Sequence, residues 1–211
     1  MRPRIAILDY GMGNLRSVEK ALERVEANVL RTDDAARARE ADALILPGVG
    51  AFPRAMERVR VLGFDAVVAE AVEGGTPVLG ICLGMQLLFS SSSENEGADG
   101  LEHLDGPVEV LDAPGLKVPH IGWSPVQWEG DSPLSKGIDD GEPFYFVHSY
   151  APRPLDSIDV LGTTAYGRRY VCAVERPPMW GVQFHPEKSS AAGLRLLANF
   201  AAISAPIGAS A

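Results

Sequence analysis

The chain is poor in cysteine, in aromatic residues and in positive charge. Only two of its 211 residues are cysteine, and 7% are aromatic. Two cysteines cannot form a disulfide framework, so we expect a reducing compartment, the cytoplasm. The 19 basic residues are outnumbered by 28 acidic ones, which gives a net charge of −9. This balance argues against a nucleic-acid-binding protein and against binding to an anionic membrane, since both need a basic surface.

The chain also lacks an apolar run of the kind that forms a secretory signal or a membrane span. Its first residues enter a strand-like run, Arg4–Asp9, with no apolar segment before it. No residue between Gly74 and Ser93 is charged, but glycines, serines and Pro77 interrupt this stretch. A buried strand followed by a helix explains it better than a membrane helix.

The composition and the length of the chain fit one folded domain. Apolar residues make up 46% of the chain and charged residues 22%, values typical of a globular protein. The length suits a single hydrophobic core, and no internal repeat is visible. We therefore expect one domain over residues 1–204, followed by a frayed tail over residues 205–211.

Short apolar runs alternate with helical periodicity in the first half of the chain. We expect strands at Arg4–Asp9, Val29–Arg31, Ala43–Leu46 and Pro77–Ile81. We expect helices over residues 15–25, from Pro53 through Val59, from an N-cap at Asp65 to Glu73, and from Leu83 to Ser90. This order predicts a parallel sheet with helices on both faces.

The second half is richer in strands. The segment Ser90–Gly100 is polar and acidic and is expected to be a loop. A last helix is expected over Ala191–Ile203. The fold class is therefore a single α/β domain with a mixed, mostly parallel central sheet flanked by helices. Strands of this half are expected near Val108–Leu111, Val118–Trp123, Phe144–Tyr150, Val160–Thr164, Val171–Glu175 and Met179–Phe184.

The strongest chemical signal is the sequence from Gly80 to Gly84, Gly-Ile-Cys-Leu-Gly. It has the spacing of a nucleophile elbow, with Cys82 at the nucleophile position and glycines on either side. A tight turn from strand to helix needs small neighbours, and a helix N-terminus favours a thiolate. The alternative is a buried structural cysteine between two glycines that serve packing.

A second signal is the tripeptide His185-Pro186-Glu187. Residues two apart in an extended segment point to the same side, and Pro186 biases His185 toward that geometry. Glu187 is thus placed to orient the imidazole, as the acid does in a nucleophilic triad. An incidental surface turn is the alternative. The two motifs strengthen each other, although only folding can bring Cys82 and His185 together.

Two further glycine-rich segments invite a functional interpretation. In Pro47-Gly48-Val49-Gly50 a backbone N–H could join that of Leu83 in an oxyanion hole, although the segment taken alone favours a plain strand-to-helix loop. Gly11-Met12-Gly13-Asn14 begins like a dinucleotide fingerprint, but Arg16 occupies the third glycine position. The four histidines lack metal-ligand spacing, so we expect neither a metal nor a cofactor.

With these residues in view, the chain resembles the class I, triad-type glutamine amidotransferases. The elbow at Cys82 and the His185-Pro186-Glu187 tripeptide carry the resemblance at the level of the superfamily. Five further segments narrow it to the glutaminase subunits of imidazole glycerol phosphate synthases, and the match runs from about Ile5 to Phe200. These segments are Asp9–Asn14, Pro47–Gly50, Pro119–Trp123, Tyr145–Tyr150 and Gln183–Ser189.

The resemblance implies a role for particular residues. Cys82 would be the nucleophile, His185 the general base and acid, and Glu187 the group that orients His185. Val49 and Leu83 would supply the oxyanion N–H groups. Gly50, Gln86 and the backbone around Ser149 would hold glutamine.

The resemblance also implies a partner. Members of the subfamily form a heterodimer with a (β/α)₈-barrel cyclase that uses the ammonia to make imidazole glycerol phosphate and aminoimidazole carboxamide ribonucleotide. Four residues would lie toward that subunit and the ammonia gate: Asn14, Trp123, Tyr145 and Lys188.

Three other functions remain open from the sequence. The chain could be the glutaminase subunit of another amidotransferase, serving anthranilate, guanine nucleotide or pyridoxal phosphate synthesis. It could be a stand-alone cysteine hydrolase of γ-glutamyl compounds, which would turn over without a partner. It could also be a binding module without catalytic activity on the same fold.

Overall fold

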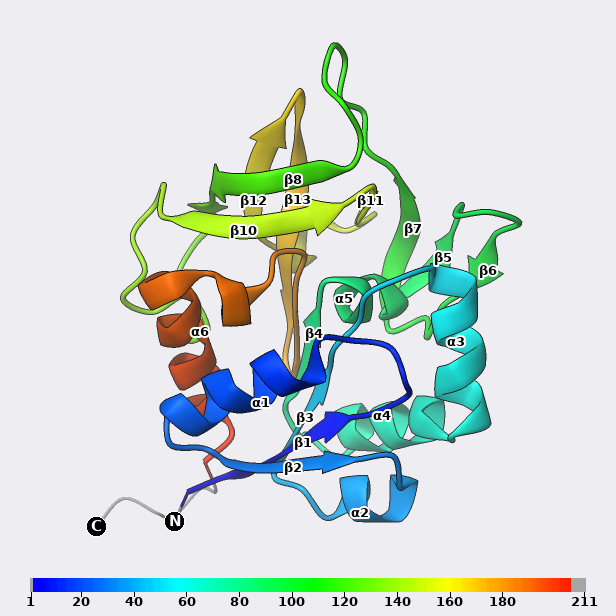
Figure 1. Cartoon of the computed structure of the whole chain (residues 1–211), viewed down its shortest axis with the longest axis vertical. Helices are drawn as coiled ribbons and strands as arrows, with labels where there is room; N and C mark the ends of the chain where they lie inside the picture. The colour runs from blue at the N-terminus through cyan, green and yellow to red at the C-terminus, as the bar shows by residue number, and fades with distance from the viewer. Residues whose placement is uncertain (1, 206–211) are drawn as a thin grey trace.

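The computed structural model describes residues 2–205 of the chain (Figure 1). Except for Ala205, the tail expected over residues 205–211 lies outside the described residues. The first half alternates strands and helices. In order these are β1 (Arg4–Leu8), α1 (Leu15–Arg24), β2 (Asn28–Thr32), α2 (Ala35–Arg39), β3 (Ala43–Leu46), α3 (Phe52–Val61), α4 (Phe64–Glu73), β4 (Val78–Ile81) and α5 (Leu83–Leu87).

The second half consists mainly of strands. Short 3₁₀ turns lie at Ser157–Asp159 and Pro186–Lys188, and the long helix α6 (Ser190–Ile203) closes the fold. The strands are β5 (Phe89–Ser92), β6 (Ala98–Asp99), β7 (Leu104–Val110), β8 (His120–Pro125), β9 (Gln127–Trp128), β10 (Pro143–His148), β11 (Tyr150–Pro152), β12 (Val160–Tyr166), β13 (Arg168–Arg176) and β14 (Met179–Val182).

One eight-stranded sheet runs through the centre of the molecule, in the order β2-β1-β3-β4-β14-β13-β12-β9. Neighbours from β2 to β14 pair in parallel, and those from β14 to β9 pair antiparallel. The predicted mixed, mostly parallel sheet is therefore confirmed. The pairing of β14 with β4 sets Val182 beside Ile81, so two strands from distant parts of the sequence end side by side.

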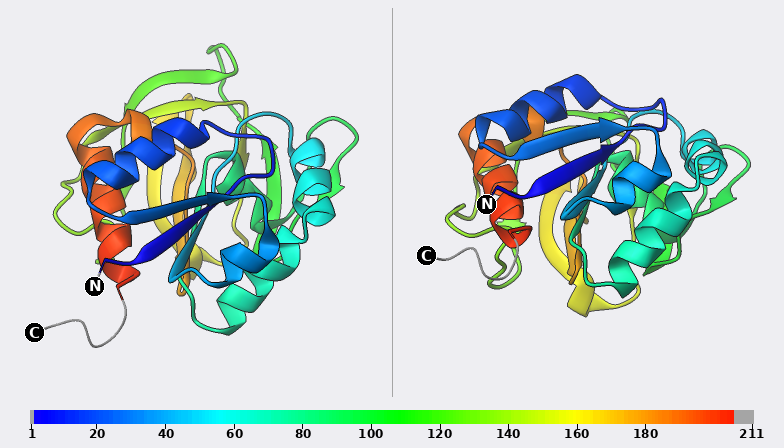
Figure 2. Two further views of the ribbon diagram at one scale, coloured as in Figure 1. Left: turned by 60° about the horizontal axis from the view of Figure 1, so that its bottom comes forward. Right: turned by 90° about the horizontal axis from the view of Figure 1, so that it is seen from below.

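The sheet is covered on both faces because its side chains alternate. In β1, Ile5 and Ile7 belong to one hydrophobic cluster, which includes α1 and α6. Ala6 and Leu8 belong to the other, which includes α3, α4 and α5. Figures 1 and 2 show the resulting layers, with α1 and α6 on one side of the sheet and α3 and α4 on the other.

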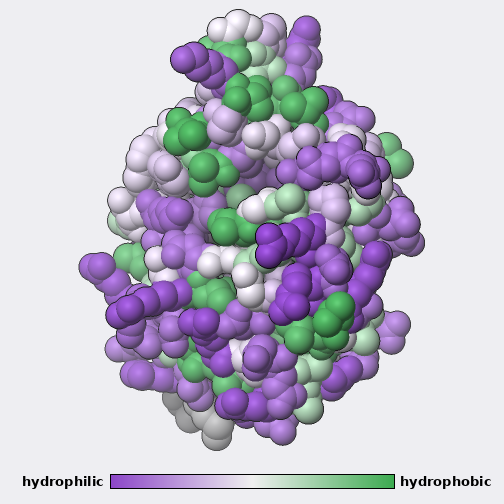
Figure 3. All heavy atoms as spheres, turned by 45° about the vertical axis from the view of Figure 1, so that its right-hand side comes forward, coloured by the Kyte–Doolittle hydropathy of each residue, from purple (hydrophilic) through white to green (hydrophobic). Residues whose placement is uncertain are grey.

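Two smaller sheets complete the domain. The ribbon of β8 and β10 lies across the central sheet near β12 and β13 (Figure 1), and a four-stranded sheet has the order β11-β7-β5-β6. On the face shown in Figure 3, apolar side chains occur in small groups among polar ones. Within residues 2–205, no helix combines the length and hydrophobicity needed to cross a membrane.

The structure corrects three local expectations. The helix expected to reach Ser90 ends at Leu87, and the expected loop Ser90–Gly100 contains β5 and β6. The backbone N–H of Gly100 bonds to Ser90 O, and Phe89 pairs with Leu104, so tertiary pairing overrides the polar composition here. The helix expected to start at an Asp65 cap instead follows Gly63, whose φ of 69° turns the chain directly out of α3. The short helix α2 was not expected.

Candidate active site

Cys82 occupies a tight turn between β4 and α5. Its φ of 54° and ψ of −110° lie outside the regions that side chains normally adopt. The flanking glycines permit this turn. A Cβ at Gly84 would lie 1.7 Å from the carbonyl oxygen of Leu46, and one at Gly80 would lie 2.7 Å from the backbone of Met85. The glycines of the elbow therefore let α5 begin almost in contact with β3.

His185 lies just past the end of β14. The backbone N–H of Cys82 bonds to Val182 O at 2.7 Å, which ties the elbow to that strand end. The N–H of His185 bonds to Tyr145 O at 2.9 Å, and Ser189 Oγ donates to His185 O at 2.6 Å. The pairing of β4 with β14 thus brings the two sequence motifs to one edge of the sheet.

Glu187 orients the ring of His185. The distance between His185 Nδ1 and Glu187 Oε1 is 2.8 Å, and both side chains are almost completely buried. A carboxylate only accepts, so Nδ1 carries the hydrogen and Nε2 is the nitrogen left for the reaction. Among residues 2–205, Nε2 has no hydrogen-bond partner.

The charges at the site favour the protonated ring. Burial lowers the pKa of His185, but its interactions with Cys82 and Glu187 outweigh burial and raise the pKa to about 10. At neutral pH the imidazolium is therefore favoured beside Cys82. A protonated ring next to a sulfur nucleophile suits a reaction that begins with a thiolate and needs a proton for the leaving group.

A cavity of about 450 Å³ opens in front of the sulfur. Of the residues singled out from the sequence, the structure brings seven to this cavity: Val49, Gly50, Cys82, Leu83, Gln86, Ser149 and Lys188. His185 and Glu187 do not line the cavity, and their side chains are buried. A cavity of this volume holds a molecule the size of an amino acid.

The two residues proposed for an oxyanion hole line the same cavity as Cys82. Leu83 is the first residue of α5, so its N–H has no acceptor within the helix. Val49 follows β3, is 39% exposed and precedes Gly50, whose φ is 110°. The Tyr10 hydroxyl donates to Pro47 O beneath this loop. A left-handed glycine next to Val49 gives the peptide between them freedom that another residue would lack.

The side-chain amide of Gln86 already forms hydrogen bonds with other residues of the protein. Its Nε2 donates to Tyr150 O at 2.9 Å and to Gln183 Oε1 at 3.0 Å, which uses both amide hydrogens. Only its carbonyl oxygen remains for a ligand. Gln183 in turn points its own amide at Cys82, with 3.6 Å from Nε2 to Sγ.

The residues expected at a partner surface fall into two places. Trp123 is half exposed, and its ring meets that of Tyr145 edge-on at 6.0 Å. Lys188 Nζ lies 5.8 Å from the centre of the Tyr145 ring. Asn14 is not part of this cluster among the described residues, since it is the N-cap residue of α1.

Sequence reasoning missed two residues of the site. Gln183 belongs to the segment that carried the resemblance, but its place in the sequence gave no sign that it contacts the sulfur. Glu94 lies in the acidic stretch read as a loop. It lines the cavity, and its Oε2 accepts from the N–H of Phe52 at 2.7 Å. Only the folded arrangement identifies either one.

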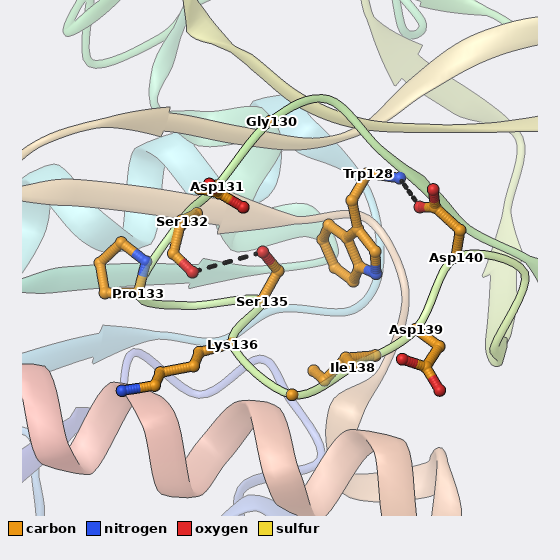
Figure 4. Close-up of a pocket in the computed structure, with 11 residues that line it drawn as sticks. Trp128, Gly130, Asp131, Ser132, Pro133, Ser135, Lys136, Ile138, Asp139 and Asp140 are labelled. Atoms are coloured by element: carbon orange, nitrogen blue, oxygen red, sulfur yellow. Dashed lines mark hydrogen bonds between the residues drawn. The ribbon is translucent and has the colours of Figure 1, made fainter.

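A roomier hollow, of about 730 Å³, lies elsewhere (Figure 4). All the residues that line it lie between 128 and 140, so this single segment curves around the hollow. The N–H of Trp128 donates to Asp140 Oδ1 across it at 2.7 Å. It contains none of the residues singled out from the sequence, so the smaller cavity at Cys82 is the candidate active site.

A family model and similar proteins of known name agree on the family to which this chain belongs. The model of the family "Glutamine amidotransferase class-I" matches residues 6–203. A protein of Moorella thermoacetica is 51% identical over 200 residues, covering 95% of this chain and 94% of its own length. One from Thermobifida fusca is 46% identical, covering 96% and 99%. Both are named imidazole glycerol phosphate synthase subunit HisH.

Solved structures agree at the level of the fold. A glutamine amidotransferase structure has a TM-score of 0.75 at 21% identity and covers 95% of this chain and 98% of its own. The structure of PurLQS from Thermotoga maritima has a TM-score of 0.71 at 20% identity, with the same coverage. The α/β architecture with a flanked central sheet is thus shared with these proteins.

Proposed function

The chain belongs to the class I glutamine amidotransferases and, within them, to the family of the imidazole glycerol phosphate synthase subunit HisH, and from this premise we propose that it hydrolyses glutamine at Cys82 and delivers the ammonia to a cyclase subunit. One observation carries the proposal. A cysteine in a strained turn lines a cavity of amino-acid size, and a histidine held by a buried carboxylate interacts with that cysteine.

The reaction begins with the thiolate of Cys82. It attacks the side-chain amide carbon of glutamine, and the amide oxygen becomes an oxyanion facing the N–H groups of Leu83 and Val49. Each such donor is worth about 3–4 kcal/mol to the transition state when it is in place. The carbon–nitrogen bond breaks as His185 gives its Nε2 proton to the nitrogen, which leaves as ammonia.

A thioester between Cys82 and the γ-carbonyl of glutamate remains. Neutral His185 takes a proton from water, and the resulting hydroxide attacks the thioester carbon. The carbon–sulfur bond breaks, glutamate leaves, and Cys82 returns to the thiolate beside a protonated His185. Glu187 keeps the ring in the tautomer that both steps require.

The charges lining the cavity suit the substrate. Glutamine carries an ammonium and a carboxylate at its α-carbon, and the cavity is lined by one acidic and one basic side chain, Glu94 and Lys188. We assign the ammonium to Glu94. The backbone at Gly50 and Ser149 and the carbonyl oxygen of Gln86 are the polar groups available for the rest of the molecule.

The partner is the cyclase subunit, in a heterodimer. Free ammonia in neutral water becomes ammonium, which is not a nucleophile, so a sealed contact with the acceptor enzyme has a chemical purpose. Lys188 lines the cavity and also lies over Tyr145, beside the exposed Trp123. This continuity supports docking of the cyclase on that face. Cys82 and Cys172 are free thiols, which supports the cytoplasm as the compartment.

The test measures glutamate release from glutamine by the full chain, alone and with a cyclase and its nucleotide substrate. We expect slow release by the chain alone and much faster release in the complex. Cys82→Ala should abolish the glutamine-dependent reaction but leave the cyclase reaction with added ammonium salt intact. Equal rates with and without a cyclase would indicate a stand-alone hydrolase, and loss of both reactions in the variant would contradict the assigned roles.

A further inference from the structure

A chain of buried and partly buried polar side chains leads away from the wall of the cavity, where it begins with His148. Tyr170, on β13, places its hydroxyl between two histidines, 2.9 Å from His120 Nδ1 and 3.0 Å from His148 Nε2. His120 Nε2 lies 2.9 Å from the hydroxyl of Ser124. His148 Nδ1 lies 2.8 Å from Tyr150 O. Three strands, β8, β10 and β13, meet in this chain, and none of its groups has a role in the reaction above.

The hydrogen bonds of this chain have only one consistent direction. The carbonyl of Tyr150 can only accept, so His148 Nδ1 carries the hydrogen. Burial lowers the pKa of His148 to about 3 and that of His120 to about 4, so both rings are neutral at physiological pH. Nε2 of His148 must then accept from Tyr170. The Tyr170 oxygen accepts from His120, and Ser124 donates to His120.

Packing fixes the positions of the His120 and His148 rings, just as the hydrogen bonds fix their tautomers. His120 is stacked between Phe146 and Tyr166, with ring centres 5.0 and 4.1 Å away. His120 and His148 are almost completely buried. A fully satisfied buried chain of this kind holds its members in one arrangement.

The chain ends on the wall of the cavity. Tyr150 O, which accepts from His148, also accepts from Gln86 Nε2 at 2.9 Å. Gln86 bonds to Gln183, whose amide points at the sulfur of Cys82. His148 and Tyr150 also bracket Ser149, whose backbone lines the cavity. Loss of the Tyr170 hydroxyl would leave the ring of His148 less firmly held, and the backbone from His148 to Tyr150 would then be less well fixed.

We propose that Tyr170 is a positioning residue of the glutaminase site, which acts through His148 to fix Ser149, the Tyr150 carbonyl and Gln86 in the shape that binds glutamine. The assignment rests on the proposed function. Tyr170 does not contact the reacting atoms, so its loss should weaken glutamine binding more than it slows the chemistry.

The test compares two tyrosine variants in the full chain with its cyclase. Tyr170→Phe removes the hydroxyl of the chain. Tyr166→Phe removes a hydroxyl from the ring stacked on His120, but that hydroxyl bonds to Lys117 O and lies outside the chain. We expect Tyr170→Phe to raise the KM for glutamine about fivefold or more, with kcat within about twofold of the wild type. Tyr166→Phe should leave both constants unchanged.

A double-mutant cycle keeps the proposal testable if one variant folds poorly. His148→Asn retains a side-chain N–H near the Tyr150 carbonyl, but the shorter side chain places no acceptor where His148 Nε2 meets Tyr170. We expect this variant to raise the KM as Tyr170→Phe does, and the double variant to be no worse than either single one. Additive effects, an unchanged KM in Tyr170→Phe, or an equal rise in Tyr166→Phe would overturn the assignment. A wild-type complex without glutaminase activity would overturn the proposed function itself, and this assignment with it.

Discussion

At the scale of single residues, the site works by fixing one ring. His185 is held on one side by a buried carboxylate at 2.8 Å, and its other nitrogen is buried without a hydrogen-bond partner among the described residues. Glu187 therefore acts on the reaction only through His185. Its negative charge also contributes to the raised pKa of that ring. Both effects need a carboxylate, so replacing Glu187 by the uncharged glutamine tests them directly.

Glu187→Gln should lower kcat for glutamine hydrolysis by about two to four orders of magnitude. The amide can present an N–H to the ring and so favour the wrong tautomer, and it no longer stabilises the imidazolium. Glutamate release by the variant complex measures the effect. The ammonia-dependent reaction of the same complex is the control and should not change. A loss of less than about tenfold would remove Glu187 from the mechanism.

Some of these residues can be found from the sequence and some cannot. Cys82 stands out because its glycine neighbours are local, and Glu187 because it lies two positions from His185. Gln183 and Glu94 do not stand out, because each reaches the site through contacts between distant segments. Gln183 lies 101 positions from Cys82 in the sequence but 3.6 Å from its sulfur. Local patterns carry no information about such pairs.

At the scale of elements, the turn at Cys82 depends on how closely α5 approaches β3. The missing side chain of Gly84 makes room for the carbonyl of Leu46. The segment that was wrongly expected to be a loop shows that local sequence alone does not decide whether a strand forms. Ser90–Gly100 looks like a loop by composition, yet Ser91 and Ser92 pair with Asp99 and Ala98 because a neighbouring strand is available. Strand formation at that site depends on tertiary context.

Gly84→Ala should destabilise the fold by about 1–3 kcal/mol and abolish glutaminase activity, since the added Cβ would push α5 away from β3. Chemical denaturation gives the free energy of unfolding. Gly75→Ala is the comparison: its surroundings are open, and it adds only left-handed backbone strain, about 1 kcal/mol, without affecting activity. The explanation of the elbow fails if Gly84→Ala is no more damaging than Gly75→Ala.

At the scale of the whole molecule, the active site exists because of topology. After β4 the chain forms the two smaller sheets and the antiparallel strands β9, β12 and β13 of the central sheet, and only then places β14 beside β4. The alternation of strands and helices allowed the parallel sheet to be predicted. Which later strand would lie next to β4 could not be read from the sequence, because any apolar strand of the second half has a suitable pattern.

The buried histidines make the stability of the whole domain depend on pH. Burial and the nearby His120 and His185 lower the pKa of His148 to about 3 in the folded chain, against about 6.5 when unfolded. Between these values only the unfolded chain binds the proton. The free energy of unfolding should therefore fall as the pH falls below 6.5, by about 1.4 kcal/mol per pH unit from this group.

His148→Asn isolates that contribution. The variant should be less stable than the wild type at pH 7, and the difference should shrink by about 2 kcal/mol between pH 6.5 and pH 5. Denaturation at several pH values in this range gives both curves, and groups common to the two proteins cancel. A difference that stays constant with pH would mean that His148 has the same pKa in the folded chain as in the unfolded one.

The central claim is that Cys82 becomes covalently attached to the γ-carbonyl of glutamine. Acid quenching of the complex during turnover, followed by digestion and mass spectrometry, tests it directly, with Cys172, buried in β13, as the internal control. We expect the mass of one glutamyl group on the peptide that contains Cys82 and none on the peptide that contains Cys172. Hydrolysis of glutamine with no adduct on Cys82, or with the adduct on another residue, would contradict it.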